Sequence, residues 1–342
     1  MTAMNATYIL FPEKGRVTVE QETVSADDLK PTEIVVRNET SIISAGTELA
    51  RLNGLEGLQF PCRPGYGSIG RIEALGSGVT DFKRGDRVFY AGKHASLQRF
   101  LHGQDHQWGL LYPVPEQLDP VDAAFGCMAQ IAMTAPNVTE LDLGDTVAVF
   151  GLGLVGNLAA QMYRQAGARV IGIDPVKRRC ELAQSVGIAE TIDAPPERQV
   201  EALKELTGGK GADVTVDAVG HSAIVTNCVE STALFGQVVL LGSPRAPFNA
   251  NLTTVMSQIH IRGLVVRGAH MWRMVPKDVR GVKRSVAWSL RVVLDLIGSG
   301  KLKVRELTRC IKPGDVPAAY AGLQSAPEQY VGVVIDWRPL SP

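Results

Sequence analysis

The chain has 342 residues, and its 35 Lys and Arg residues balance its 35 Asp and Glu residues, so the formal net charge is zero. Without a broad positive field, neither nucleic acid nor a membrane surface is expected as a partner. Hydrophobic residues make up 45% of the chain and charged residues 20%, a globular balance that excludes disorder as the main state, and the length favours two domains. No apolar run reaches the roughly 18 residues of a membrane span, and the first residues lack the features of a signal peptide, so a cytoplasmic location is expected.

The cysteines are odd in number, widely spaced, and include no Cys-x-x-Cys pair. This pattern supports neither a disulfide framework nor a cysteine-rich zinc lobe. They are Cys62, Cys127, Cys180, Cys228 and Cys310.

The first third of the chain is rich in short strands and turns. Apolar alternation predicts strands over residues 33–37, 68–73 and 86–89, separated by turns such as Gly76-Ser77-Gly78. These elements predict a small, barrel-like β domain.

From Thr146 the pattern changes to strands that alternate with helices, which is typical of a doubly wound parallel sheet. A helix over residues 284–297 and a strand over 332–336 follow, and the strand is expected to return to the first domain. The fold is therefore predicted as α/β, with a discontinuous β domain (1–126 and 269–342) and a Rossmann domain (127–268). The predicted strands of the second domain are 146–150, 169–173, 213–217, 237–241 and 261–266, and its predicted helices are 154–165, 175–186, 197–207 and 222–234.

A glycine-rich segment, Gly151-Leu152-Gly153-Leu154-Val155-Gly156, follows the first strand of this second domain and opens a helix. Gly-x-Gly-x-x-Gly alone is a weak signal, but this context is the one that a dinucleotide site requires. Gly151 permits a tight turn, Gly153 lets the backbone approach a pyrophosphate, and Gly156 lets helix and strand pack closely. The exposed N–H groups of the helix N-terminus attract the anion.

Asp174 ends the second strand, eighteen residues after Gly156. A carboxylate there can accept both ribose hydroxyls and repels a 2′-phosphate, which favours NAD(H) over NADP(H). Lys177, Arg178 and Arg179 soften that preference. Asp174-Pro175 also reads as a helix N-cap followed by proline at the first helical position, and both interpretations can hold together.

Several motifs in order resemble those of the medium-chain dehydrogenase/reductase superfamily, nearly from end to end. The resemblance implies a GroES-like barrel joined to a Rossmann domain, a nicotinamide-dependent oxidoreductase with its site between the domains, and a homodimer paired through the last Rossmann strand near residues 261–267. The motifs are Ile43-Ser44-Ala45-Gly46-Thr47-Glu48, Pro64-Gly65-Tyr66-Gly67, Lys83-Arg84-Gly85-Asp86-Arg87-Val88, Gly144-Asp145-Thr146-Val147, the glycine-rich segment, Val216-Asp217-Ala218-Val219-Gly220 and Ser299-Gly300-Lys301-Leu302. The expected cofactor-binding residues are Gly151, Gly153, Leu154, Val155, Gly156, Asp174, Arg179, Gly242 and Ser243.

The chain departs from the zinc-dependent members of that superfamily. Where they carry Cys-Gly-Thr-Asp-like and Gly-His-Glu motifs, this chain has Ala45-Gly46-Thr47-Glu48 and Gly65-Tyr66-Gly67. Cys127 falls near the third ligand position, but one thiolate cannot replace the three protein ligands of a catalytic zinc. We therefore expect no catalytic metal. A narrower resemblance, to the bacteriochlorophyllide-type dehydrogenases, rests on Ser44–Leu49, Pro61–Gly67 and Lys93-His94-Ala95-Ser96.

Without a Lewis acid, a side chain must exchange the proton of the reacting hydroxyl. Tyr66 replaces the lost histidine, Thr47 occupies the family's hydroxyl-relay position, and a histidine such as His94 can exchange protons near neutral pH. These three are the catalytic candidates. The residues expected to line the substrate are Glu48, which could orient His94, together with His270 and Trp272.

Each candidate also has a structural explanation. Tyr66 could only fill the vacated metal pocket, and Thr47 could cap a helix start. His94 could be an ordinary hydrogen-bonded residue, and His270 could pack at a domain boundary. His102 and His106 have helical spacing, but Gly103 argues against a metal site on a helix there, and Cys127 fits a buried small residue better than a nucleophile.

The sequence thus favours a zinc-independent, NAD(H)-dependent oxidoreductase that interconverts a polar secondary alcohol and its ketone, on a sugar, polyol or cyclic metabolite. Two alternatives stay open. One is a reductase of activated C=C bonds, which would favour NADPH, and the other is a non-catalytic nucleotide-binding redox sensor.

Overall fold

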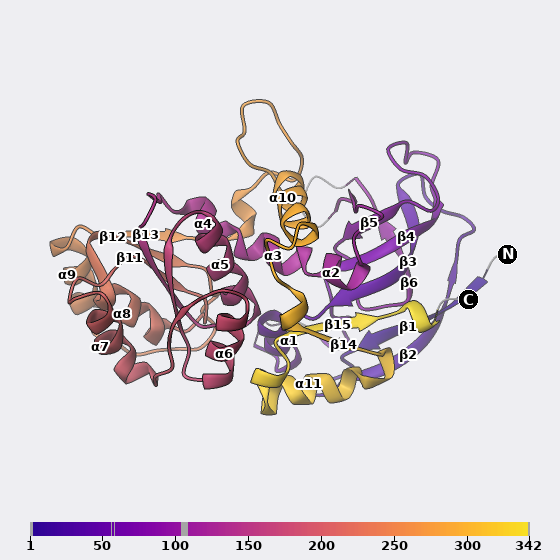
Figure 1. Cartoon of the computed structure of the whole chain (residues 1–342). Coiled ribbons are helices and arrows are strands. Elements are labelled where there is room, and N and C mark those ends of the chain that lie inside the picture. Colours follow the sequence, from indigo (N-terminus) through magenta and orange to yellow (C-terminus); the bar gives the residue numbers. More distant parts are fainter. Residues whose placement is uncertain (1–2, 56, 58, 104–108, 341–342) are drawn as a thin grey trace. The chain divides into compact units, whose positions relative to one another are not determined.

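The computed structural model describes residues 3–55, 57, 59–103 and 109–340, which form two units (Figure 1). Residues 269–273 and 300–307 belong to the second unit and Cys127 to the first, the reverse of the predicted assignment. Hydrogen bonds to α5 (Leu154–Gln165) account for residues 300–307, because the side-chain amides of Gln161 and Gln165 donate to the Lys303 and Lys301 carbonyls, each at 3.0 Å. The first unit is Met1–Cys127, Met274–Ser299 and Thr308–Pro342, and the second is Met128–Arg273 and Gly300–Leu307.

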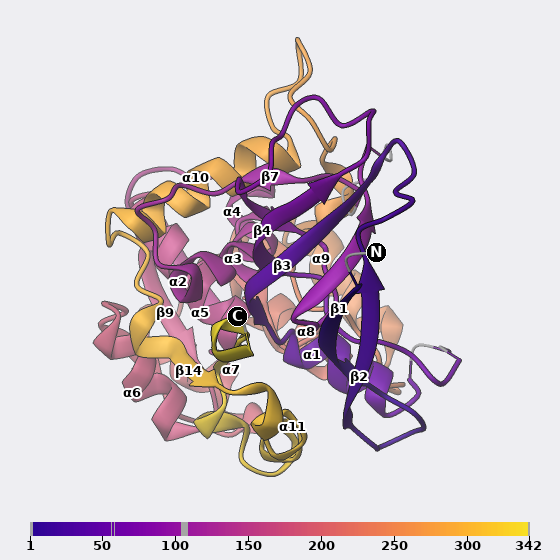
Figure 2. The ribbon, with the colours of Figure 1, turned by 90° about the vertical axis from the view of Figure 1, so that its right-hand side faces the viewer.

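The first unit is built on a seven-stranded, mostly antiparallel sheet in which β3 is the central strand. β3 pairs with β4, β6 and β15, and among the strands of the described residues in this sheet only the β14–β15 pair is parallel. Figure 2 shows β3 beside β4 and β1 beside β2, the antiparallel hairpin that forms a separate sheet. The strands are β1 Ala3–Leu10, β2 Thr18–Ser25, β3 Glu33–Ile42, β4 Ser68–Leu75, β5 Arg87–Tyr90, β6 Leu97–Leu101, β7 Tyr112–Pro113, β14 Thr308–Ile311 and β15 Gly332–Asp336.

Helices α1 and α11 of this unit pack together on a shared apolar core. Ile43 and Leu52, at either end of α1, meet Tyr320 and Leu323 of α11 in that core, which Trp337 completes. This packing fixes α1, whose residues form part of the site described below. The helices are α1 Ala45–Leu52, α2 Pro120–Ala124, α3 Gly126–Ala132 (which continues into the second unit), α10 Val286–Gly298 and α11 Val316–Ser325, with 3-10 turns η3 Pro313–Asp315, η4 Pro327–Gln329 and η5 Arg338–Leu340.

The second unit is a six-stranded parallel sheet in the order β10-β9-β8-β11-β12-β13. Its first strand, β8, lies between β9 and β11, so the direction of winding reverses there, and ligands of such sheets bind at the carboxyl ends of the strands at this point. The strands are β8 Thr146–Phe150, β9 Arg169–Ile173, β10 Glu190–Ile192, β11 Ala212–Asp217, β12 Thr232–Leu240 and β13 Val265–Gly268. The helices are α4 Thr134–Val138, α5 Leu154–Gln165, α6 Lys177–Ser185, α7 Pro196–Leu206, α8 Ser222–Ser231 and α9 Leu252–Ile261, with 3-10 turns η1 Met271–Arg273 and η2 Arg305–Leu307.

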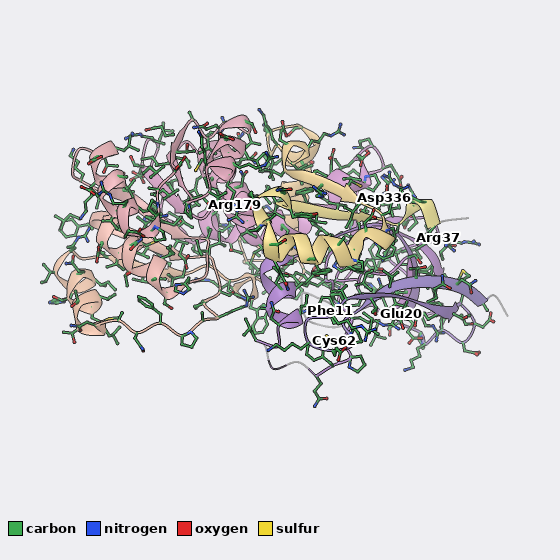
Figure 3. The ribbon with its side chains drawn as sticks, turned by 90° about the horizontal axis from the view of Figure 1, so that it is seen from below. Phe11, Glu20, Arg37, Cys62, Arg179 and Asp336 are labelled. Carbon is green, nitrogen blue, oxygen red and sulfur yellow. The ribbon has the colours of Figure 1, made fainter. Side chains whose placement is uncertain are left out.

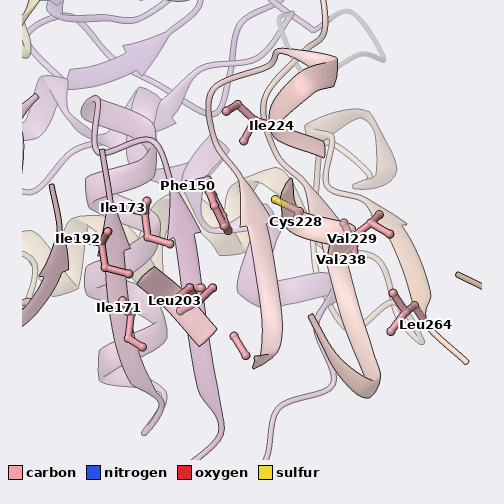
Figure 4. Close-up of a cluster of buried hydrophobic side chains, with 12 residues drawn as sticks. Phe150, Ile171, Ile173, Ile192, Leu203, Ile224, Cys228, Val229, Val238 and Leu264 are labelled. Carbon is pink, nitrogen blue, oxygen red and sulfur yellow. The ribbon is translucent and has the colours of Figure 1, made fainter. Parts of the chain in front are cut away.

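Both faces of the parallel sheet are covered, as a doubly wound fold requires. Phe150 and Ile173 on one face meet Leu203 of α7 and Cys228 of α8 in one apolar cluster (Figure 4). The alternate residue Val149 is equally buried. The architecture is therefore the predicted one, a GroES-like β unit and a Rossmann unit.

Several predicted boundaries are wrong. The helix expected over residues 222–234 ends at Ser231, and the strand expected over residues 237–241 begins at Thr232. The strand expected over residues 261–266 begins only at Val265, because α9 continues to Ile261 and is closed by the Leu264 N–H, which donates to Ile259 O at 3.0 Å. Gly263, with φ +61°, permits this helix end. Helix α6 begins at Lys177 with Val176 as its N-cap, so Asp174 is not an N-cap residue.

No helix within the described residues is long and apolar enough to span a membrane. All five cysteines carry free thiols, and Cys127 is fully buried as expected of a small packing residue.

Candidate active site

The glycine-rich segment follows β8 and leads directly into α5 in the second unit. Gly151 has φ +93°, and a Cβ at Gly156 would lie 1.8 Å from Gly151 O, so the close approach of turn and helix requires glycine there. No atom lies within 4 Å of a Cβ built at Gly153, and Gly153 is an N-cap without a side-chain acceptor. The first N–H groups of α5 have no acceptor within the helix, which suits a bound phosphate.

Asp174 lies just beyond β9, beside this segment, and is 1% exposed. Its carboxylate accepts hydrogen bonds from Leu152 N at 2.8 Å and Val176 N at 2.9 Å, which ties the glycine-rich segment to the next loop. Arg179, which is labelled in Figure 3, approaches the same carboxylate at 3.4 Å. The buried Nε of Arg179 has no hydrogen-bond partner among the described residues. A cation and a carboxylate therefore meet where the adenosine ribose is expected.

A second carboxylate, Asp217, organises the loop after β11. Its Oδ1 accepts from Val219 N at 2.9 Å and Gly220 N at 3.0 Å, while its carbonyl accepts from Gly242 N at 2.7 Å. Burial raises the pKa of Asp217, although these backbone donors act in the opposite direction. Val219 lies against Gly151, since a Cβ built there would be 2.6 Å from Val219 Cγ2. Asp217 belongs to one of the family-like motifs, but its hydrogen bonds to the loop after β11 were not predicted.

Tyr66 is the centre of a group of hydroxyls in the first unit, at the segment that leads into β4. Its phenol donates to Ser44 Oγ and also hydrogen-bonds the Thr47 side chain, so the residues at the start of α1 contact it directly. Burial raises the pKa of Tyr66, and the nearby Cys127 and Glu48 raise it further. The phenol is therefore protonated at neutral pH. Ser44 was not among the predicted site residues, although it lies beside the Ala45-Gly46-Thr47 motif.

His94 and Glu48, in contrast, belong to a closed network, and both are 0% exposed. His94 Nδ1 lies 2.8 Å from Ser41 Oγ, and His94 Nε2 lies 3.0 Å from Glu48 Oε2. Glu48 also accepts from Ser44 N at 2.9 Å and from the Tyr320 hydroxyl. Burial raises the pKa of Glu48, but the charge and hydrogen bond of His94 outweigh it, and the net pKa is lowered.

This network corrects two assignments. Glu48 was predicted to line the substrate, but its carboxylate faces only buried partners. His94 was predicted to exchange a proton with substrate, but both of its ring nitrogens are engaged inside the unit. The physical reason is that successive positions of α1 face different ways, so Thr47 reaches Tyr66 while Glu48 points into the core. The geometry therefore favours a positioning role for His94 and Glu48 over direct contact with a substrate.

The remaining candidates lie elsewhere. His270 and Trp272 of the second unit form an edge-to-face pair with ring centroids 5.2 Å apart, and Trp272 is 71% exposed; their contact with substrate stays a prediction. His102 lies 3.3 Å from Asp81 Oδ2 and accepts from Leu111 N at 3.3 Å. His106 lies outside the described residues.

Comparison with known proteins agrees with this architecture. Residues 30–131 match the profile of the alcohol dehydrogenase GroES-like domain, and residues 155–283 match that of the zinc-binding dehydrogenases. The chain belongs to the medium-chain, zinc-type alcohol dehydrogenase family. It is an oxidoreductase of the alcohol dehydrogenase type.

Individual relatives of this alcohol dehydrogenase-type chain cover different shares of it. An uncharacterized zinc-type alcohol dehydrogenase-like protein of Haemophilus influenzae is 25% identical over 84% of this chain and 87% of its own length. The 5-exo-hydroxycamphor dehydrogenase of Pseudomonas putida is 31% identical over 58% of this chain and 66% of its own. A crystal structure described as a zinc-binding dehydrogenase, from Sinorhizobium meliloti and bound to NADP, has a TM-score of 0.80 at 22% identity and covers 97% of this chain and 99% of its own.

The residues at the family's zinc-ligand positions do not fit that metal here. Ala45 has no donor atom, and Tyr66 and Cys127 offer a phenol and a thiol whose pKa values are both raised by burial. Gly67 leaves no room for a carboxylate, because a Cβ there would lie 2.6 Å from Cys127 Sγ. Elsewhere in the described ranges, no three His, Cys, Asp or Glu side chains gather as a metal site. A catalytic zinc needs about three protein ligands, which these positions do not supply.

Proposed function

We propose that the chain is a zinc-independent, NAD(H)-dependent oxidoreductase that interconverts a polar secondary alcohol and its ketone, with Tyr66 as the group that hydrogen-bonds the reacting oxygen. The observation that carries this proposal is the position of the Tyr66 hydroxyl. Tyr66 stands at the position where zinc-dependent relatives carry a zinc-binding histidine. Its hydroxyl hydrogen-bonds the side chains of Ser44 and Thr47.

The preference for NAD(H) rests on Asp174. Its carboxylate follows β9 and is already fixed by two backbone donors, so it can accept ribose hydroxyls with little further ordering. Arg179 beside it can receive a 2′-phosphate, so we expect weaker binding of NADP(H) rather than its exclusion.

When bound, the nicotinamide donates or accepts hydride at the carbinol carbon. In the reductive direction, the protonated Tyr66 phenol polarises the substrate carbonyl and then gives its proton to the oxygen. The Thr47 and Ser44 hydroxyls hydrogen-bond this phenol and can return a proton to it from solvent. Because burial raises the pKa of Tyr66, the phenol is protonated at neutral pH, so the proton that ketone reduction needs is present on it.

Names of relatives support the substrate class. They include the D-guloside 3-dehydrogenase of Escherichia coli, 30% identical over 50% of this chain and 48% of its own length, besides the hydroxycamphor enzyme. A sugar, polyol or cyclic secondary alcohol is therefore the class to screen first.

We also propose a homodimer through β13. This strand ends the parallel sheet, and its Val265 and Val266 are 41% and 42% exposed, with Phe235 and Ile261 exposed beside it. An exposed apolar edge strand is a template for pairing. Val266→Asp should convert the dimer to a monomer in multi-angle light scattering, and a wild-type monomer would contradict the proposal.

Nucleotide titration and a substrate screen test the enzymatic proposal. NADH and NADPH are titrated by fluorescence, with NADH expected to bind more tightly, and alcohols, ketones and enones are then assayed with both nucleotides. Reduction of enones alone would favour the C=C reductase, and tight NADH binding without any turnover would favour a sensor.

A further inference from the structure

Ser44 takes part in both polar groups of the first unit. Its backbone N–H donates to Glu48 Oε1 at 2.9 Å, while its side-chain Oγ accepts from the Tyr66 hydroxyl. The Glu48 N–H in turn donates to Ser44 O at 2.8 Å, so the two residues are bonded in both directions. One serine therefore joins the buried carboxylate to the candidate proton donor.

The start of helix α1 departs from the usual serine cap. A serine at the N-cap commonly accepts from the backbone of the first turn with its own hydroxyl. Ser44 is the N-cap residue of α1 but makes no such side-chain hydrogen bond. Glu48 instead reaches back from the first turn to the Ser44 N–H, much as the acidic residue of a capping box does. The Ser44 hydroxyl is thereby available to Tyr66.

The Glu48 carboxylate is itself held from two further elements. His94, in the loop between β5 and β6, has its Nε2 3.0 Å from Glu48 Oε2, and the imidazole donates because a carboxylate can only accept. Tyr320 of α11 donates its hydroxyl to the same oxygen. The net pKa of Glu48 is lowered, so the ionised carboxylate accepts strongly from its donors at neutral pH. These contacts fix the position of the oxygen that Ser44 approaches.

Tyr66 is held at its backbone and its ring as well as at its hydroxyl. The His94 N–H donates to Pro64 O at 3.0 Å, just before Tyr66 in the chain. Gly65 has φ +99°, and a Cβ there would lie 2.6 Å from His94 N, so the segment approaches His94 only because this residue is glycine. The Arg51 guanidinium lies over the Tyr66 ring, with its Cζ 5.8 Å from the ring centroid. The direction of the phenolic O–H then depends on its hydrogen-bond partners.

We propose that Glu48 is a positioning residue for the reaction, acting through Ser44 on Tyr66. Its carboxylate fixes the serine, and the serine hydroxyl orients the phenol toward the reacting oxygen. When the phenol turns its proton to a ketone, the Ser44 hydroxyl can donate to the phenolic oxygen instead of accepting from it. This inference rests on the proposed function, in which Tyr66 protonates the substrate. Since misplacement of a catalytic group by about 1 Å can cost about a hundredfold in rate, a small displacement of Ser44 should be seen in kcat.

The environment of the Tyr66 hydroxyl is measured without turnover, by NMR of NADH-saturated protein labelled with carbon-13 at the tyrosine Cζ. The chain has seven tyrosines, and the Tyr66 signal is the one that Tyr66→Phe removes. We expect Glu48→Gln to shift or broaden this signal. Tyr163→Phe is the control, because Tyr163 is fully buried in the second unit and hydrogen-bonds Thr139 Oγ1 at 2.7 Å. It should leave the Tyr66 signal unchanged.

A double-mutant cycle tests whether Glu48 acts through the serine hydroxyl. Ser44→Ala removes that hydroxyl but keeps the N–H that Glu48 accepts, so the closed network stays intact. Each of Ser44→Ala and Glu48→Gln should lower kcat for ketone reduction at least about tenfold, with KM unchanged because the contact acts in the transition state. Since the two residues act in series, Glu48→Gln added to Ser44→Ala should lower kcat no further. Circular dichroism and thermal melting establish that each variant is folded at the assay temperature.

Three results would overturn the inference. They are an unchanged Tyr66 signal in Glu48→Gln, an unchanged kcat in that variant, and a full further loss of kcat when Glu48→Gln is added to Ser44→Ala, which would show a general structural effect. If Glu48→Gln does not fold, Tyr320→Phe takes its place in both experiments, since it removes one donor to the carboxylate and changes no charge. Failure of the proposed function is a different result, seen as a normal rate in Tyr66→Phe or as no turnover by the wild type, whereas the NMR measurement needs no reaction.

Discussion

Two polar groups include neighbouring residues of α1, Thr47 in one and Glu48 in the other, and they differ in how far their residues are buried. The network of Ser41, Glu48, His94 and Tyr320 is closed, and each member has a buried partner. The residues Thr47 and Tyr66, in contrast, are each partly exposed. Residue type alone would make the histidine and the glutamate the catalytic pair. The comparison teaches that access decides which polar group can meet a substrate and which one holds the scaffold.

The largest expected effect is on stability, in the closed network. His94→Ala leaves the buried Glu48 carboxylate without its main partner, and loss of one member of a buried pair costs about 3 to 5 kcal/mol of unfolding free energy. Urea unfolding measures it. Glu13→Ala is the control, because Glu13 forms an exposed pair with Arg16 worth at most about 1 kcal/mol. Equal effects of the two substitutions would show that the network is not a structural anchor.

The next effect is on turnover, in the open group. Tyr66→Phe removes the proton donor and should lower kcat at least about a hundredfold, while the affinity for NADH stays the same. Tyr330→Phe is the matched control, since Tyr330 is also half-buried under an arginine, Arg309, 4.2 Å from its ring centroid. A normal rate in Tyr66→Phe would remove this residue from the mechanism.

The pH dependence of the two groups should also differ. Burial raises the pKa of Tyr66, so the reductive rate should be flat through neutral pH and should not fall until above the ordinary tyrosine value of about 10. A pH–rate profile measures this, once the protein is shown to be stable over the pH range used. A decline of the rate between about pH 6 and 8, where histidine titrates, would point to another proton donor.

Acid unfolding probes the closed group. The folded-state pKa of Glu48 is lowered from 4.5, so its stabilising contribution is complete above pH 4.5 and is lost as the pH falls through the lower folded-state pKa. The stability difference between wild type and Glu48→Gln should therefore be largest at neutral pH and shrink below pH 4.5. A constant difference, measured by denaturant unfolding across that range, would contradict the ionised state of Glu48.

The smallest effect is expected at Thr47. Thr47→Val removes one neutral hydrogen bond to Tyr66, worth about 0.5 to 1.5 kcal/mol, so kcat should fall by at most about tenfold. Single-turnover assays measure this loss. A loss as large as that of Tyr66→Phe would make Thr47 an obligatory proton relay.

The second unit was largely predictable from the sequence, because its signals are local. Strands 146–150 and 169–173 occur at the predicted residues, since each is a continuous apolar run between turn residues, and Gly167, with φ +95°, lies just after α5 as predicted. The failure at residues 261–266 has the same origin: an apolar run reads equally well as a buried helix end or as a strand.

The site in the first unit was only partly predictable. Tyr66 and Thr47 were predicted through motifs that resemble a known family, and their side chains do hydrogen-bond each other; their catalytic role stays a prediction. The burial of the Glu48 carboxylate in a hydrogen-bond network could not be predicted from the sequence. Tyr320 lies 272 residues further along the chain and contacts Glu48 only because α11 packs on α1. Sequence patterns identify a polar residue, but its burial depends on such long-range packing.

The central claim is that alcohol or ketone chemistry in this chain depends on Tyr66 and not on zinc. The most direct measurement is turnover by chelator-treated protein whose metal content is determined by mass spectrometry on the same sample. The account predicts full activity with substoichiometric zinc. Activity that is lost on chelation and restored in proportion to added zinc would contradict it.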